Sequence, residues 1–249
     1  MSVYNRLLLL PMLALFSLAC NEKKGFTSED YFEMTSKSIS KSFKKALDNP
    51  AAISSLNLSK NEITEIPKEL DGRFVNLIQL TLRENAIEEV PSAIGNITKL
   101  RSLHLGKNKL KTIPAFIGKL REMSNLTLEL NEISALPDVA FRFDPLSTLD
   151  LRWNKLEYLP ASFAKSSIAQ LFLSGNPIKE LPINIGELKG LKVLWLADSE
   201  ISEVPESFFQ LHKLNWLDVR GTQLTEEQLM EIKEKLPNCK IQSDFEIDK

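Results

Sequence analysis

The chain has 249 residues, of which 43% are hydrophobic and 26% are charged, so it is neither low-complexity nor collagen-like. Its 31 basic and 33 acidic residues leave a formal net charge of −2, which excludes the strongly basic field of a nonspecific nucleic-acid-binding protein. The 2 cysteines, Cys20 and Cys239, are too few for a disulfide framework. The 9 glycines argue against a fold that depends on glycine-rich phosphate loops.

The first twenty residues have the layout of a signal peptide. A short polar start that contains Arg6 is followed by an almost uninterrupted apolar run over residues 7–18. At 1.5 Å per residue this run covers ~18 Å of the ~30 Å hydrocarbon core of a bilayer, so it is too short to remain as a membrane-spanning helix. We therefore expect residues 1–19 to be cleaved.

The residues at the expected cleavage point are Ser17-Leu18-Ala19-Cys20. They resemble the lipobox of bacterial lipoproteins, in which a small residue precedes a cysteine that is acylated on its sulfur. The resemblance implies that residues 1–19 are a lipoprotein signal peptide, that Cys20 carries a lipid, and that residues 20–26 contain this cysteine and a short tether. An ordinary secretory signal with an incidental cysteine is the alternative interpretation.

A helical cap is expected over residues 27–50. Thr27 or Ser28 is suited to begin a helix, and Asn49-Pro50 is suited to end it. Between them, five apolar residues recur at helical spacing and would cover the first repeat. These residues are Phe32, Ile39, Phe43, Ala46 and Leu47.

From Ile53 onward the chain repeats the pattern L-x-x-L-x-L-x-x-N-x-L eight times, with the copies 22 to 24 residues apart. Each of the first seven copies continues with an apolar residue, a proline, two variable residues and another apolar residue. Positions four and six, counted from the first apolar residue, alternate with other residue types as in a short strand with one buried face. One copy buries too little apolar surface to fold alone, so the copies must stack. The ninth positions are Asn61, Asn85, Asn108, Asn131, Asn154, Asn176, Ser199 and Thr222.

This pattern resembles the leucine-rich repeat family in its 23-residue form. The resemblance implies an α/β fold, a right-handed solenoid with short parallel strands on the concave face, irregular or short helical segments on the convex face, and helical caps at both ends. The eight repeats would occupy residues 51–224, and residues 225–249 would form the C-terminal cap. Thr225 and Gln228 match a capping box at the start of that cap, and Cys239 and Ile241 are expected to alternate along a last short strand, with Cys239 as a buried residue.

The recurring asparagine at the ninth position has a structural explanation. A buried side-chain amide offers two donors and an acceptor, enough to bind backbone groups of its own and adjacent copies. Ser199 and Thr222 replace it in the last two copies and are expected to supply fewer hydrogen bonds.

The sequence contains no arrangement that is typical of a catalytic or metal site. His104 and His212 lie in different copies, and His104 is expected to face solvent near Arg101 and Lys107, without an acid to orient it. The two cysteines are separated by almost the whole chain, so no His/Cys/Asp spacing suits a metal ion. We therefore expect no enzymatic activity, no metal and no cofactor.

A candidate binding site follows from the positions that face the concave surface. Because the core uses positions one, four and six, positions two, three, five, seven and eight are expected to face outward. Trp153, Trp195 and Trp216 all occupy such positions, and Phe172 and Val193 would extend their apolar patch. The alternative is that the rings merely pack together and stiffen this end of the solenoid. A polar rim around the patch, typical of protein-binding hot spots, is expected from Asp150, Arg152, Lys192, Asp198, Asp218 and Arg220.

These observations favour a noncatalytic, lipid-anchored protein-recognition module of a bacterial cell envelope, resembling bacterial leucine-rich-repeat lipoproteins. The expected partners are a protein ligand on the concave face and the membrane through the N-terminal lipid, with no nucleic acid, and the protein is expected to be a monomer. The alternative is an intracellular scaffold or signalling regulator of the same fold, with an uncleaved N-terminus.

Overall fold

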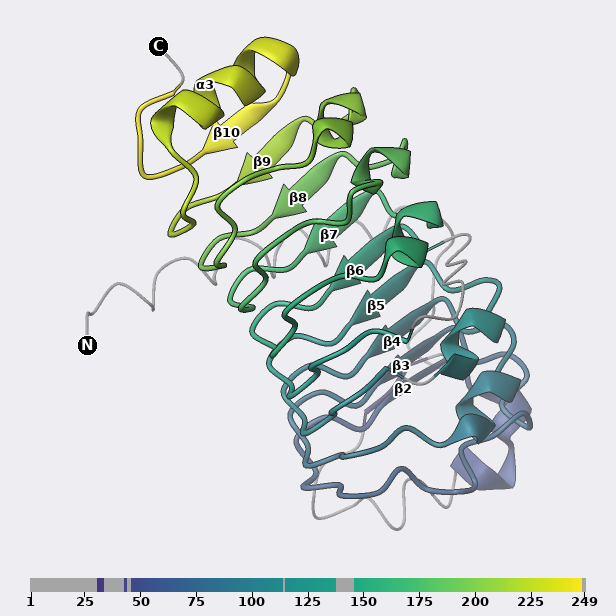
Figure 1. Ribbon diagram of the computed structural model, residues 1–249. Helices are drawn as coiled ribbons and strands as arrows, with labels where there is room; N and C mark the ends of the chain where they lie inside the picture. Colours follow the sequence, from purple (N-terminus) through teal and green to yellow (C-terminus); the bar gives the residue numbers. More distant parts are fainter. Residues whose placement is uncertain (1–30, 34–42, 44–45, 114, 138–145, 248–249) are drawn as a thin grey trace.

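The computed structural model describes residues 31–33, 43, 46–113, 115–137 and 146–247. Their coils stack along one axis into a curved solenoid (Figure 1). Ten short strands, one from each coil, form a single sheet in which every neighbouring pair is parallel and the strand order follows the chain. The strands are β1 Tyr31–Glu33, β2 Ser55–Asn57, β3 Gln79–Thr81, β4 Ser102–His104, β5 Asn125–Thr127, β6 Thr148–Asp150, β7 Gln170–Phe172, β8 Val193–Trp195, β9 Trp216–Asp218 and β10 Lys240–Gln242. The predicted α/β solenoid is confirmed.

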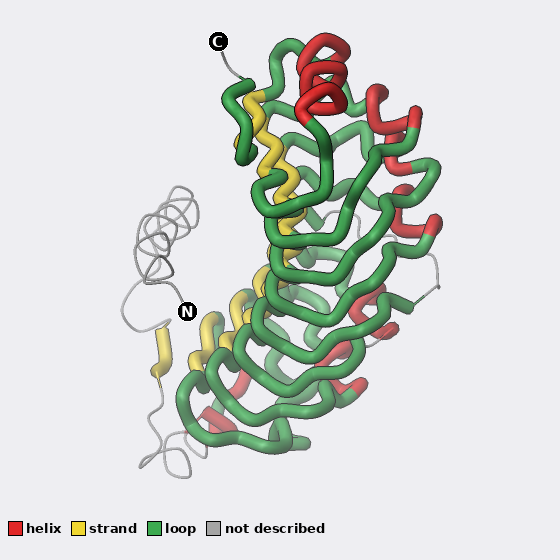
Figure 2. The backbone as a smooth tube through the Cα atoms, turned by 60° about the vertical axis from the view of Figure 1, so that its left-hand side comes forward, coloured by secondary structure: helices red, strands yellow, loops and turns green. Residues whose placement is uncertain are grey.

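The sheet lines the concave side, and short helical segments lie on the opposite, convex side (Figure 2). Pro91, Pro160 and Pro205 directly precede three of these helices, with φ angles of −67°, −66° and −69°. Because proline has no N–H to give to a sheet, this half of each repeat turns away from the strands and forms the convex return. The 3-10 helices are η3 Pro50–Ala52, η4 Ser92–Asn96, η5 Ala115–Lys119, η6 Ala161–Lys165, η7 Ile185–Glu187 and η8 Glu206–Gln210.

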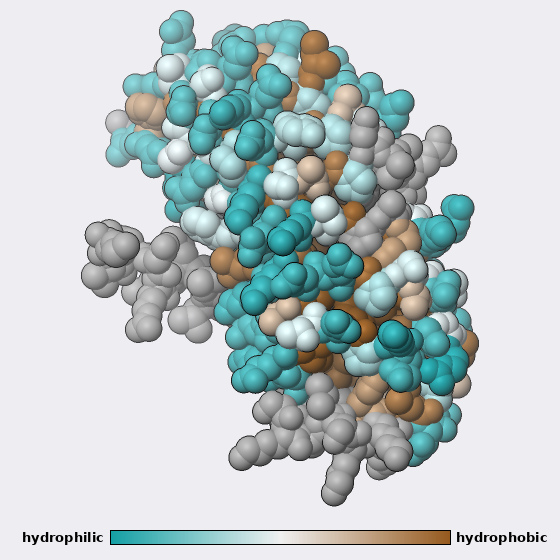
Figure 3. Space-filling model, turned by 60° about the horizontal axis from the view of Figure 1, so that its bottom comes forward, coloured by the Kyte–Doolittle hydropathy of each residue, from teal (hydrophilic) through white to brown (hydrophobic). Residues whose placement is uncertain are grey.

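The core lies between the sheet and the convex segments. The fourth and sixth positions of each copy point into it, and Leu103 and Leu105, for example, have no exposed surface. Phe74, Phe163 and Phe208 are the largest fully buried side chains and fill the convex half. Polar side chains cover much of the outer surface, with apolar groups visible between them (Figure 3).

The asparagine ladder forms as predicted. Asn131 is representative, because its Oδ1 accepts from the backbone N–H of Leu110 at 3.0 Å and its Nδ2 donates to the carbonyls of Leu105 and Leu128 at 3.0 and 2.9 Å. In the last two copies, the Ser199 hydroxyl is buried without a hydrogen-bond partner, and the Thr222 hydroxyl donates only to its own coil. The replacements therefore supply fewer bonds between coils, as expected.

The C-terminal cap is also as predicted. Helix α3, Glu226–Lys235, begins with the capping box of Thr225 and Gln228, and β10 follows it and extends the sheet. Cys239 is buried as expected, with 1% of its surface exposed, but it directly precedes β10 and is not part of the strand. Within the described ranges, none of the helices has the length and apolar character needed to cross a membrane.

The N-terminal cap differs from the prediction. Tyr31–Glu33 form a strand that pairs with β2, so the helix expected over residues 27–50 does not include Phe32. Aromatic residues favour strands, and this strand pairs the edge of β2 that would otherwise be open. Ala46 is buried, and Phe43 and Leu47 pack against the core as expected. The predicted signal peptide, residues 1–19, and the lipidated Cys20 with its tether lie outside the described residues.

Candidate functional site

The register of the sheet arranges the concave face in columns. Each third position pairs with the third position of the next copy, and each fifth position with the next fifth, through β2 to β9. The fifth-position column is polar at first and becomes aromatic near the C-terminal end. Its members are Asn57, Thr81, His104, Thr127, Asp150, Phe172, Trp195 and Asp218.

The centre of the candidate site is a pair of aromatic rings on β7 and β8. Phe172 and Trp195 are register partners, and their ring centroids lie 4.9 Å apart at an interplanar angle of 74°, an edge-to-face contact. Trp195 is partly exposed, but Phe172 keeps only 2% of its surface. The expectation that Phe172 itself faces a ligand is therefore wrong. The neighbouring side chains cover it, so that it lies beneath the surface of the concave face.

Arg152 lies against both rings. Its guanidinium carbon is 5.6 Å from the centroid of Phe172 and 5.5 Å from that of Trp195, within the range of cation–π contacts. The Asp150 carboxylate accepts hydrogen bonds from two nitrogens of Arg152, from Nε at 2.9 Å and from Nη2 at 2.6 Å. Burial opposes the charge of Arg152, but its hydrogen bonds to Asp150 and the charges of Asp150 and Glu129 keep its pKa above the usual value.

The predicted polar rim is only partly at the surface. Asp150 and Asp218 are each 2% exposed, so they do not form a rim. Each accepts hydrogen bonds from the arginine two residues later, because strand alternation brings side chains i and i+2 to the same face. Hydrogen bonding to Asp218 raises the pKa of Arg220. Lys192 and Asp198 are exposed, as expected.

The other predicted aromatic residues surround the ring pair without joining it. Trp216 is 38% exposed and is the register partner of Val193. Since it occupies a third position and Trp195 a fifth, the two lie diagonally, and within the described coils no ring contact joins them. Trp153 is 45% exposed and covers Gly175 of the next coil, where a Cβ would lie 2.4 Å from the indole.

Trp153 also has an unusual backbone. The eighth position of every copy has a positive φ, and at Trp153 the angle is 56°. This left-handed conformation is the turn by which each coil leaves its strand, and it places successive eighth positions next to one another. The eighth positions are Lys60, Glu84, Lys107, Leu130, Trp153, Gly175, Asp198 and Gly221.

An ion-pair network in the N-terminal half of the concave face was missed by sequence analysis. Glu129 reaches across the neighbouring coil to Arg83, with 2.9 Å between Oε1 and Nε, although the two residues are two repeats apart. The carboxylate passes over Gly106, where a Cβ would lie 2.1 Å from Oε1. Burial, followed by the charge of Asp150, raises the pKa of Glu129. The sequence feature that could have revealed this pair is Gly106, the one glycine at a seventh position of the eight copies, because its missing side chain leaves room for Glu129 to cross the coil.

His104 belongs to the same region. Its Nδ1 lies 3.1 Å from the Thr127 hydroxyl on β5, and the side chain is partly buried. Burial, with a further contribution from the charge of Arg83, lowers the pKa of His104 to about 4. The expectation of a solvent-facing histidine near Arg101 and Lys107 is wrong, and at neutral pH His104 is an uncharged member of the concave floor.

Three ion pairs hold charged groups of the concave face, namely Arg83 with Glu129, Arg152 with Asp150, and Arg220 with Asp218. The described residues contain no cluster of three or more histidines, cysteines or acidic residues that could hold a metal ion. Partly exposed Trp195, exposed Trp216 and the stacked guanidinium of Arg152 are the groups that a ligand would contact first.

A family model described as leucine rich repeat matches residues 51–116 and 121–178. The chain is a leucine-rich repeat protein.

Several solved leucine-rich repeat structures are similar to this protein. An internalin from Listeria monocytogenes aligns with a TM-score of 0.68 and 26% identity over 81% of this chain and 59% of its own. A TDR receptor gives a TM-score of 0.66 at 25% identity, covering 82% of this chain and 36% of the receptor chain. The plant peptide hormone receptor RGFR1, solved in complex with RGF2, gives a TM-score of 0.62 at 25% identity, covering 78% of this chain and 33% of the receptor chain.

A curated relative gives a shorter match. The disease resistance-like protein DSC1 of Arabidopsis thaliana is 39% identical over 62 residues, which make up 25% of this chain and 5% of that protein. The leucine-rich repeat protein thus spans only a fraction of the length of these relatives.

Proposed function

We propose that this leucine-rich repeat protein is a noncatalytic recognition module that binds a protein partner on the C-terminal half of its concave face. The observation that carries the proposal is the arrangement of Arg152 on the rings of Phe172 and Trp195. Tryptophan and arginine are enriched in protein-binding hot spots, and the guanidinium of Arg152 is already held in place by Asp150. The exposed Trp216 extends this surface by one coil.

The similar structures support a protein partner. The plant peptide hormone receptor RGFR1 was solved in complex with RGF2, and its structure aligns with 78% of this chain. Three ion pairs within the concave face also favour a partner that contributes apolar and hydrogen-bonding groups, because Arg83, Arg152 and Arg220 are already paired with acidic residues of the same face.

The test is a pull-down with residues 21–249 against bacterial envelope proteins and host extracellular proteins, followed by calorimetry with the protein captured. Replacing Trp195→Ala together with Trp216→Ala should weaken binding by ~2–4 kcal/mol while the fold persists. Phe245→Ala is the control, because Phe245 is 44% exposed but lies in the C-terminal segment after β10. Unchanged affinity of the double variant would place the binding site elsewhere.

We also propose that the protein is attached to a bacterial cell envelope through a lipid on Cys20. Support comes from the sequence alone, namely the apolar run over residues 7–18 that ends at this cysteine. Cys20→Ala should abolish incorporation of labelled palmitate and release the protein from the membrane fraction. Cys239→Ala is the matched control, since this thiol is buried in the C-terminal cap.

Globomycin separates this proposal from the alternative of an intracellular scaffold. Accumulation of an unprocessed form under globomycin supports the lipoprotein. A full-length protein in the cytosol under all conditions, or palmitate label that persists in Cys20→Ala, would refute it.

A further inference from the structure

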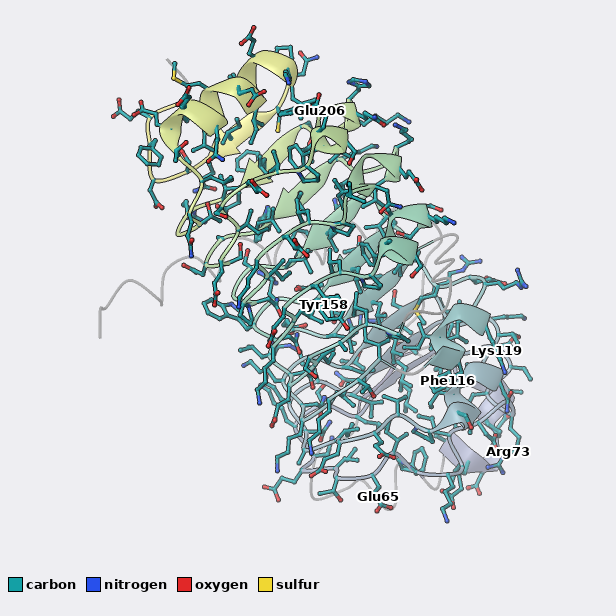
Figure 4. The ribbon with its side chains drawn as sticks, in the orientation of Figure 1. Glu65, Arg73, Phe116, Lys119, Tyr158 and Glu206 are labelled. Carbon is teal, nitrogen blue, oxygen red and sulfur yellow. The ribbon has the colours of Figure 1, made fainter. Side chains whose placement is uncertain are left out.

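A groove on the flank of the solenoid lies outside the concave face. It has a volume of about 420 Å³ and is formed by repeats five, six and seven. Leu159 and Leu181 make its floor, and Tyr158 and Ile183 its walls. Two acidic residues, Glu180 and Glu203, complete the flank groove. Figure 4 places Tyr158 on the flank of the coils that faces the viewer, in front of the strands.

The solenoid does not need the two walls of the flank groove for its own core. Tyr158 and Ile183 occupy the thirteenth and sixteenth positions of their copies, on either side of the buried fourteenth position and its proline. Among the seven copies that contain the proline, the others carry Glu, Thr or Ala at the thirteenth position and Lys, Ser, Ala, Asp or Glu at the sixteenth. A large apolar residue at these positions is therefore a departure from the repeat, and both departures line the same groove.

Both side chains are solvent-exposed. Ile183 has 83% of its surface exposed and Tyr158 has 52%, whereas Leu159 and Leu181 on the floor have 5% each. Ile183 is the most exposed of the large apolar residues in the described chain. Adjacent exposed apolar groups with a polar border are typical of surfaces that are covered by a partner.

The negative charge at the border of the flank groove indicates which kind of partner can bind there. Glu180 and Glu203 are exposed, and neither forms an ion pair within the described coils. A second copy of this chain docked through the same groove would bring these carboxylates against themselves, which is unfavourable in a symmetric contact. A partner that is complementary to the flank groove instead carries positive charge on either side of an apolar side chain.

We propose that the flank groove binds a segment of a partner protein in which one large apolar side chain lies between basic residues. The apolar side chain fills the space between Tyr158 and Ile183, and the basic residues pair with Glu180 and Glu203. This surface is separate from Trp195 and its neighbours on the concave face, so the protein can hold two partner segments at once.

The probes are capped twelve-residue peptides with a central leucine or phenylalanine flanked by lysine and arginine, compared with the same peptides carrying glutamate. The basic peptides should bind the wild-type protein, and Ile183→Ser should weaken binding about tenfold, with a similar loss from Glu180→Gln combined with Glu203→Gln. Since Ile183 is 83% exposed, the melting temperature of Ile183→Ser should remain that of the wild type.

The matched control is the equivalent groove of repeats one and two. Its lining includes Glu65, Glu89 and Lys68, which stands at the position of Ile183, and it has no exposed apolar walls like those at Tyr158 and Ile183. Glu65→Gln combined with Glu89→Gln, the equivalents of Glu180 and Glu203, should change peptide affinity less than twofold, the size of effect expected from distant, screened surface charges. If the control variant loses as much peptide affinity as Glu180→Gln combined with Glu203→Gln, the peptides bind through general electrostatic attraction and the proposal is overturned.

Three other results would overturn it. They are peptides that bind Ile183→Ser as well as the wild type, a preference for the glutamate peptides, and a dimer in sedimentation that Ile183→Ser abolishes. The double variant Trp195→Ala with Trp216→Ala should bind the basic peptides normally, so that failure of the concave-face proposal and failure of the flank groove are distinguished.

Discussion

Asn131 provides the sharpest test of what holds the coils together. The replacement Asn131→Ala removes three hydrogen bonds of 3.0 Å or less to the backbone, from the N–H of Leu110 and to the carbonyls of Leu105 and Leu128, and a longer one of 3.5 Å to the carbonyl of Glu129. Each carbonyl keeps a second donor, because Asn108 also donates to Leu105 and Asn154 to Leu128. The N–H of Leu110 is the group left buried without an acceptor.

The expected loss of stability follows from this count. A stranded buried N–H costs ~1–3 kcal/mol, and each of the two lost bonds to carbonyls that keep another donor costs ~0.5–1 kcal/mol, so the total is about 2–5 kcal/mol. Ser199 is the internal control at the same position of repeat seven. Its hydroxyl is buried and makes no hydrogen bond, so Ser199→Ala should change stability by less than ~0.5 kcal/mol.

The assay is urea unfolding followed by circular dichroism for the wild type and both variants. The midpoint for Asn131→Ala should fall at an unchanged slope, which shows that the solenoid still unfolds as a unit. If Asn131→Ala costs no more than Ser199→Ala, the ladder does not stabilise the stack and the argument from its hydrogen bonds fails.

Two further predictions concern the network on the concave face. Gly106→Ala should displace Glu129 from Arg83 and destabilise the protein by ~1–3 kcal/mol in thermal unfolding, whereas Gly118→Ala, where no atom lies within 4 Å of the added Cβ, should be nearly neutral. The pKa of His104 is about 4 in the folded protein and 6.5 ordinarily, so the unfolded chain binds the extra proton between these values. Stability should therefore fall as pH is lowered from about 6.5 to about 4, by up to ~3 kcal/mol, and unfolding of the His104→Gln variant should lose this part of the pH dependence. A pH profile identical in the variant and the wild type would contradict the burial of the imidazole.

The sequence by itself determined the repeat, the buried positions of each copy and the asparagine ladder between neighbouring copies. In a solenoid most contacts join neighbouring coils. The spacing of Leu103, Leu105 and Asn108 therefore predicts which residues are buried and which side-chain amide binds the adjacent coil. The capping box of Thr225 and Gln228 was equally predictable, because it is a contact over three residues.

Only the tertiary structure decided the features that depend on the length and direction of side chains. The sequence places Phe172 at an outward position but cannot tell that Arg152 and Trp195 flank it closely enough to bury it. Likewise, the pairing of Glu129 with Arg83 skips a coil, which no nearest-neighbour pattern contains. A periodic sequence dictates where each backbone position lies, but long side chains on a curved face choose partners by charge and free space, and those are known only once all the coils are in place.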